Sequence, residues 1–123
     1  MAQEHTVLVT TQTADAAIEP FRFVKKTATG VAAATAGTDK IMGVMNANQA
    51  VATGQATPVS LLGTAIVEAS AAISVGAYVT ATTAGKAVST TTAGHVVRGI
   101  ALEEATADGD LIEVMLVLFH HKA

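Results

Sequence analysis

The segment from Gly94 to Val117, GHVVRGIALEEATADGDLIEVMLV, is the stretch that decides the fold. Its alternate residues fall on opposite sides of an extended chain, and the later part keeps one side wholly apolar, with Ile112, Val114, Leu116 and Leu118. Because side chains alternate between the faces of a strand, this spacing predicts two half-buried strands. The sequence Asp108-Gly109-Asp110 supplies the turn, since glycine accepts positive φ and aspartate hydrogen-bonds to its own backbone. We therefore expect a hairpin that anchors the core.

Length and composition indicate one β-rich unit. The chain has 123 residues, which is enough for a single domain that folds without disulfides or metal. Aromatic residues make up only 3%, so the core must be built from small and β-branched side chains. Alanine favours helix, but the many Thr, Val and Gly residues and the two-residue alternation favour strand. The expected fold class is mainly β, a small barrel-like or sandwich-like domain with an extended N-terminal arm.

From Lys26 onward the chain repeats itself at a nearly constant offset, so that Val59 matches Val114, 55 positions later. Two glycine pairs follow the same offset, Gly30 with Gly85 and Gly54 with Gly109. Two copies are too few for a solenoid, and they predict a pseudo-symmetric barrel or sandwich. Gly43 and Gly99, near the centre of one strand in each copy, predict bulges or bends.

Residues 63–78 are expected to connect the two copies. Within them, residues 71–76 predict one short helical turn that ends at Gly76, with Ile73 closing the end of the barrel. Before the first copy, Phe21 and Phe23 are predicted on one side of a strand, where packing inward is favoured over stacking on bases.

Residues 1–19 are interpreted as an N-terminal arm and residues 20–123 as a single β-rich domain. The segment Thr6, Val7, Leu8, Val9, Thr10 and Thr11 has strong strand propensity, and residues 13–17 are expected to form a turn or a mobile link. An isolated strand cannot satisfy its own backbone groups. The arm must therefore pair with the sheet of this domain or with the sheet of a neighbour, and the sequence leaves both alternatives open.

The search for catalytic chemistry is negative. The chain has no cysteine, no nucleophile elbow, no phosphate-binding loop and no paired zinc-binding histidines on a helix. His120 and His121 are adjacent, so in a strand they would point to opposite sides, and His5 and His95 are distant in sequence. We expect no catalytic residue, no metal site and no cofactor.

Charge and hydropathy exclude two further classes of partner. The formal net charge is -3 and Lys25-Lys26 is the only adjacent basic pair, which argues against nucleic-acid binding. No run reaches the roughly 18–20 apolar residues of a membrane span. The densest acidic group is Glu103, Glu104, Asp108 and Asp110. Its spacing does not match a calcium-binding EF-hand loop, and it is interpreted as a solvated loop or as a polar contact to a basic partner.

The C-terminal half resembles the small capsid decoration, or cement, proteins of tailed bacteriophages. The resemblance covers residues 60–117 best and is carried by four motifs in order. They are an I-x-x-G turn at Ile73–Gly76, a Thr/Ala/Gly-rich hairpin at Thr82–Val88, a G-x-A-L-E-x-A strand end at Gly99–Ala105, and a G-D-x-I-x-V strand at Gly109–Val114.

This resemblance implies a β-rich, non-enzymatic protein that forms a homotrimer and binds the major capsid protein on the outer surface of the virion. It would be made in the host cytoplasm and would stabilise the shell against internal DNA pressure. Residues 6–11 could then order on binding by joining the edge of a capsid sheet. The alternative interpretation is a β-rich adhesion or carbohydrate-binding module of a virion or cell surface. Tyr78 is the only tyrosine and tryptophan is absent, which argues mildly against a sugar site.

Overall fold

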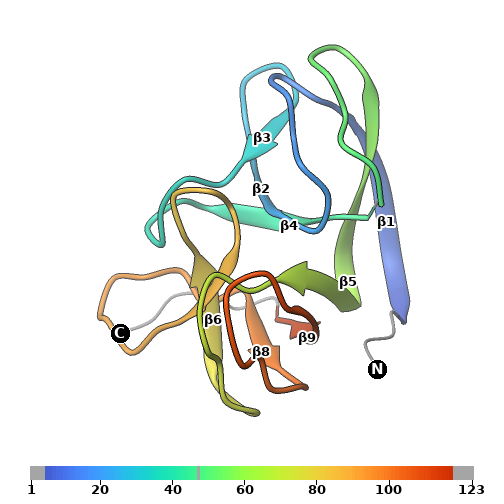
Figure 1. The fold of residues 1–123 in the computed structure, drawn as a ribbon. Helices are drawn as coiled ribbons and strands as arrows, with labels where there is room; N and C mark the ends of the chain where they lie inside the picture. The colour runs from blue at the N-terminus through green and yellow to red at the C-terminus, as the bar shows by residue number, and fades with distance from the viewer. Residues whose placement is uncertain (1–4, 47, 118–123) are drawn as a thin grey trace.

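The computed structural model describes residues 5–46 and 48–117, and the regular structure of these residues is entirely β-strand. This confirms the expected mainly β fold. Figure 1 shows two groups of strands stacked on each other, an upper group coloured blue to green and a lower group coloured yellow to red. The strands are β1 (Thr6–Thr13), β2 (Phe23–Lys26), β3 (Val31–Ala33), β4 (Ile41–Met45), β5 (Ala56–Glu68), β6 (Tyr78–Ala81), β7 (Ala87–Ser89), β8 (Gly99–Ala101) and β9 (Leu111–Leu116).

The long strand β5 belongs to both groups. Its first part lies between β1 and β4, and its second part pairs with β9, giving the order β3-β2-β4-β5-β9-β8-β6-β7 with β1 also on β5. The transition falls at Gly63, where φ is +95 and a Cβ would overlap the carbonyl oxygen of His5. Glycine is required there because other residues rarely adopt this backbone conformation.

A short parallel bridge joins the two ends of the strand order within each group. Ala14, directly after β1, bridges Val31 of β3, and Ala69, directly after β5, bridges Ala87 of β7. Two antiparallel bridges repeat in the same way, Ile18 with Val51 and Ile73 with Ala105. Each group is therefore a small rolled sheet whose two ends meet at a single bridge beyond the end of β1 or β5, as in a partly closed barrel.

The predicted internal repeat is confirmed, and it begins earlier than the sequence indicated. The amide of Gly54 donates to Ala14 O at 2.8 Å, and the amide of Gly109 donates to Ala69 O at the same distance. Ala69 lies 55 positions after Ala14, as Gly109 does after Gly54. We therefore define the first repeat as residues 6–60 and the second repeat as residues 61–116. Strand β1 is the counterpart of the second part of β5.

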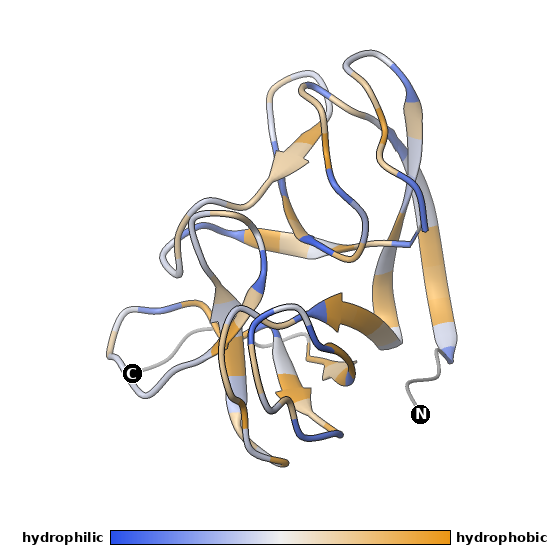
Figure 2. Ribbon diagram, viewed as in Figure 1, coloured by the Kyte–Doolittle hydropathy of each residue, from blue (hydrophilic) through white to orange (hydrophobic). Residues whose placement is uncertain are grey.

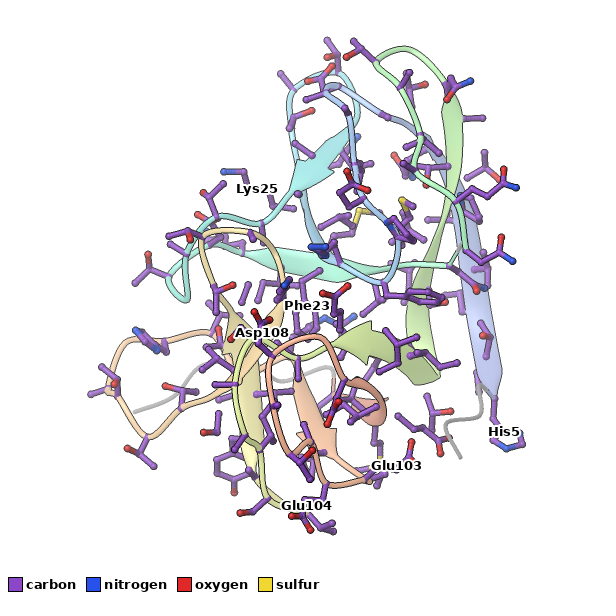
Figure 3. The ribbon with its side chains drawn as sticks, in the orientation of Figure 1. His5, Phe23, Lys25, Glu103, Glu104 and Asp108 are labelled. Carbon is purple, nitrogen blue, oxygen red and sulfur yellow. The ribbon has the colours of Figure 1, made fainter. Side chains whose placement is uncertain are left out.

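The core consists of two apolar clusters. One fills the first repeat with Ala14, Ile18, Val24, Val31, Met45 and Val59. The other fills the second repeat, and it also takes in four residues of the first repeat, Phe23, Ala34, Ile41 and Val44. Figure 3 shows Phe23 at the level where the two groups of strands meet. The outer face of the first repeat thus packs against the second repeat.

The structure agrees with some local expectations and corrects others. Of the two expectations for residues 13–17, the structure agrees with the turn, with bends at Asp15 and Ala16, and Ala14 is buried with its amide donating to Gln55 O at 2.8 Å. Residues 71–76 form a bend, a bridge at Ile73 and a turn at Val75-Gly76 instead of a helical turn, although the expected burial of Ile73 is confirmed. Phe21 lies in a turn with φ 61, and only Phe23 is in the strand.

The predicted hairpin around the acidic loop is confirmed, since β8 pairs with β9 in antiparallel register. The bulge expected near Gly43 is present as a register shift between Val24 and Lys25 on the facing strand. No such shift occurs in the pairing of Gly99, which instead allows close approach of the Val79 side chain and the Met115 carbonyl.

Candidate interaction surface

The six residues predicted to bind a partner, Thr6, Val7, Leu8, Val9, Thr10 and Thr11, all lie in β1. Thr10 pairs with Val59, and Thr11 pairs with Pro58, so β1 is a strand of this domain's own sheet. The sequence left open whether this strand pairs with its own domain or with a neighbour. In the structure it pairs with the sheet of its own domain. Among the named strands of the described chain, β5 is the only neighbour of β1, and one long edge of β1 therefore faces away from the sheet.

The face and edge of β1 are unusually apolar for an outermost strand. Val7 is 74% exposed, and Leu8 and Val9 are also exposed. Figure 2 shows the apolar colour running along the middle of β1. Soluble proteins usually protect such an edge with charged residues or proline, but Thr6–Thr13 has neither. Two register shifts around Leu8 are the only irregularity in its pairing. An uncharged, exposed edge strand is a template for pairing with another chain.

The acidic residues predicted as polar contacts do not form one patch. Figure 3 shows Glu103 and Glu104 at the far end of the lower group, with Asp108 well apart from them. Glu103 accepts the amide of Glu113 at 2.8 Å, and Glu104 is exposed. Asp108 forms an ion pair with Lys86 at 2.8 Å. The cluster seen in the sequence is therefore divided among local structural roles.

Asp110 organises the loop between β8 and β9. Its carboxylate accepts the amide of Thr106 at 2.7 Å, the hydroxyl of Thr106 at 2.9 Å, and the amide of Ala107 at 3.3 Å. These bonds, first of all the one from the Thr106 amide, hold the pKa of Asp110 below its ordinary value. In the loop between β3 and β4, the Asp39 carboxylate likewise accepts the backbone amides of Thr35 and Ala36.

A chain of ion pairs that was not predicted from the amino-acid pattern joins the two repeats. Arg22 of the first repeat contacts Glu68 at 3.4 Å, and Lys86 contacts the other carboxylate oxygen of Glu68 at 2.9 Å. Lys86 also contacts Asp108, and these two carboxylates, Asp108 foremost, raise the pKa of Lys86. The chain ties the end of β5 to loops on both sides of the junction.

Arg98 is a further cation at the junction of the two repeats, and its role was not predicted from the sequence. It is buried, and its guanidinium donates to Val117 O at 2.7 Å, Leu61 O at 2.7 Å and Met42 O at 3.0 Å. Burial lowers its pKa, although arginine remains protonated in any ordinary solution. Because Met42 belongs to the first repeat and Arg98 to the second, this side chain fixes their junction. The sequence signal for this role is a lone arginine in the apolar segment that leads into β8.

The described residues offer no evident ion site and no membrane-spanning helix. Within residues 5–46 and 48–117, no three His, Asp or Glu side chains are grouped so that they could hold a metal. His95 Nδ1 lies 2.7 Å from Thr90 Oγ1, and His5 is exposed directly before β1. His120 and His121 lie outside the described residues. None of the described segments forms a helix long and apolar enough to cross a bilayer.

Comparison with known proteins agrees with this architecture. The fold is similar to the crystal structure of the head fiber gp8.5 N base of bacteriophage phi29, with a TM-score of 0.67 and 24% sequence identity. The similarity covers 94% of this chain and 98% of that one. Among curated proteins, no sequence match was found. The sequence profile of phage cement proteins matches residues 2–116, which is nearly the whole chain, and this protein therefore belongs to the phage cement protein family.

Proposed function

We propose that this protein decorates the outer surface of a phage head as a homotrimer, binds the major capsid protein through β1, and stabilises the shell. The observation that carries the proposal is the uncharged, exposed edge of β1 in a member of the cement family. The protein would be made in the host cytoplasm and would act as a structural component without catalysis.

The edge of β1 is suited to strand addition. A strand that joins this edge would gain main-chain hydrogen bonds, and Val7 and Val9 would supply apolar contact. The Ala14 and Ile18 anchors hold β1 in place before binding, so the entropic cost of ordering the strand is already met by the fold. This differs from an arm that orders on contact. The exposed Glu104 and the partly paired Asp108 are secondary candidates for polar contacts.

Trimerisation would compensate for the small area of a single β1 edge. A stable protein interface buries on the order of 1,600 Å² in total, and one strand edge supplies only part of that area. When three edges belong to one particle, the second and third contacts form at a high effective concentration. Weak individual contacts then give durable attachment at a symmetric position of the shell.

The test is binding to heads that lack decoration, measured by cosedimentation with fluorescently labelled protein. The double substitution Val7→Lys and Val9→Lys should weaken binding by at least about tenfold, because charge on an edge opposes strand addition. Val75→Lys is the matched control, since Val75 is equally apolar and 65% exposed but lies in a turn of the second repeat.

Circular dichroism and melting would verify that both variants remain folded. If the double variant binds heads as tightly as the wild type, β1 is not the contact. If the wild-type protein shows no saturable binding to decoration-free heads, the proposed function itself is wrong.

A further inference from the structure

The outer face of the second repeat carries a row of apolar side chains that no part of the described chain covers. Tyr78 of β6 pairs with Ile100 of β8, and Ile100 pairs with Met115 of β9. Residues directly opposite each other in antiparallel strands share one face of the sheet. Tyr78 is 49% exposed and Met115 is 40% exposed, so this face is turned to solvent. We call these three residues the outer row.

The first repeat contains the same row in the same register. Phe23 of β2 pairs with Val44 of β4, and Val44 pairs with Ser60 of β5. Phe23 corresponds to Tyr78 and Ser60 to Met115 at the offset of 55 positions, and Val44 corresponds to Ile100. In the first repeat, however, Phe23 and Ser60 are both 0% exposed. The row therefore has the same strand pairing in both repeats. It is buried in the first repeat and exposed to solvent in the second.

The cover on the first repeat is supplied by the second repeat. Phe23 and Val44 belong to the same apolar cluster as Val96 and Leu116. Polar contacts flank the apolar ones, since the Phe23 amide donates to Gly85 O at 2.8 Å. The guanidinium of Arg98 likewise reaches back to the first repeat, as described above. In the first repeat the row is therefore a packing surface. The part of the molecule that packs on it is the second repeat, which has the same strand arrangement.

We propose that the outer row of Tyr78, Ile100 and Met115 binds a second copy of this chain. Within the described residues there are two repeats, and no part of either covers the row of the second repeat. A second molecule can supply that cover, because it carries the same kind of unit. Exposed apolar faces of this kind on soluble proteins are characteristic of interaction sites. Leu102, whose amide donates to Glu113 O at 2.9 Å, is also exposed and extends the apolar surface beside the row.

The contact between the repeats joins one surface to a different surface and is therefore heterologous. A heterologous contact repeated between chains closes into a ring when the rotation between copies permits closure, and a cyclic homotrimer is built from contacts of this type. The inference thus names the surface that would hold together the trimer of the proposed function. Self-association through the outer row does not itself depend on binding to a phage head.

The experiment is sedimentation velocity on the full-length protein over a range of concentrations from about 0.1 to 100 µM. Met115→Lys and Tyr78→Lys should each raise the dissociation constant of self-association by at least about 30-fold, because a charge would be buried at the centre of an apolar contact. Leu111→Lys is the matched control. Leu111 is also an exposed β9 residue, at 45%, but its counterpart Ala56 in the first repeat is exposed and not covered.

Self-association that is lost in Met115→Lys and Tyr78→Lys but retained in Leu111→Lys would support the assignment. A wild-type protein that stays monomeric at 100 µM would overturn it. Equal dissociation by Leu111→Lys, or undiminished association of both row variants, would also overturn it. Cosedimentation with heads distinguishes the two proposals. A monomer that binds heads refutes only the outer row, whereas an associating protein that ignores heads refutes only the capsid function.

Discussion

Single residues at the junction of the repeats determine how firmly the two halves are held. Arg98 binds three backbone carbonyls, and among the described residues these carbonyl dipoles, and no carboxylate, compensate its charge. Such an arrangement stabilises only while all of its bonds are made, because buried carbonyls without a donor are costly. Arg98 therefore contributes to stability through hydrogen bonds to carbonyls that are distant from it in the sequence.

Replacing Arg98 with methionine should lower the free energy of unfolding by about 2–4 kcal/mol, because three carbonyl acceptors lose their donor. Chemical denaturation at neutral pH would measure the change. Lys40→Met is the control, since Lys40 is exposed and also loses a positive charge. A loss as small as that of the control would mean that water replaces the guanidinium at little cost.

Gly63 is the residue at which β5 passes from one group of strands to the other. Gly63→Ala should destabilise the protein by clearly more than Gly54→Ala, for which we expect about 1 kcal/mol. Both glycines have positive φ, but a Cβ at Gly63 would overlap His5 O, whereas a Cβ at Gly54 meets nothing within 4 Å. Thermal unfolding of the two variants would measure how much stability is lost through the contact between the added methyl group and His5 O. Equal losses of stability in both variants would show that β1 moves to accommodate the methyl group.

At the scale of elements, short loops are held by carboxylates instead of by packing. In the loop between β8 and β9, the Asp110 carboxylate adds three hydrogen bonds, from Thr106 and Ala107, to the backbone bonds of the loop. Gln55 plays the corresponding part in the first repeat, where it accepts the amide of Ala52 at 2.6 Å. The same loop geometry is thus maintained by a titratable group in one repeat and by a neutral group in the other.

This difference predicts that the loop between β8 and β9 is sensitive to acid, whereas the corresponding loop of the first repeat, held by Gln55, is not. The pKa of Asp110 in the folded protein lies below its ordinary value of 3.8, so its contribution is complete above that value and is lost as pH falls through the folded pKa. Asp110→Asn should therefore lower the melting temperature at pH 6, and the gap to wild type should narrow toward pH 3. A gap that stays constant over this range would contradict the role assigned to the ionised carboxylate.

At the scale of the whole molecule, duplication explains both the core and the surface. The first repeat is complete because the second repeat covers its outer face, and the second repeat keeps the matching face exposed. Together with the β1 edge, this gives the molecule two apolar surfaces built from different strands. We assign one to the shell and the other to a second copy, and the Lys substitutions described above test them separately.

The amino-acid sequence by itself determined the strands, the turns and the family. Alternation and turn glycines act between near neighbours, so the hairpin of β8 and β9 and the repeat at 55 positions could be read directly. The strand propensity of residues 6–11 was likewise local. Its exposure, however, depends on which strands lie beside it.

Only the tertiary structure decided that β1 is the first strand of a repeat, that Arg98 spans the junction, and that the acidic group is dispersed. Each of these depends on pairing between residues distant in the chain, such as Thr10 with Val59 or Arg98 with Met42. Local patterns contain no information about such pairings. The outer row was equally hidden, because Phe23 and Tyr78 occupy equivalent positions and differ only in what the rest of the fold places above them.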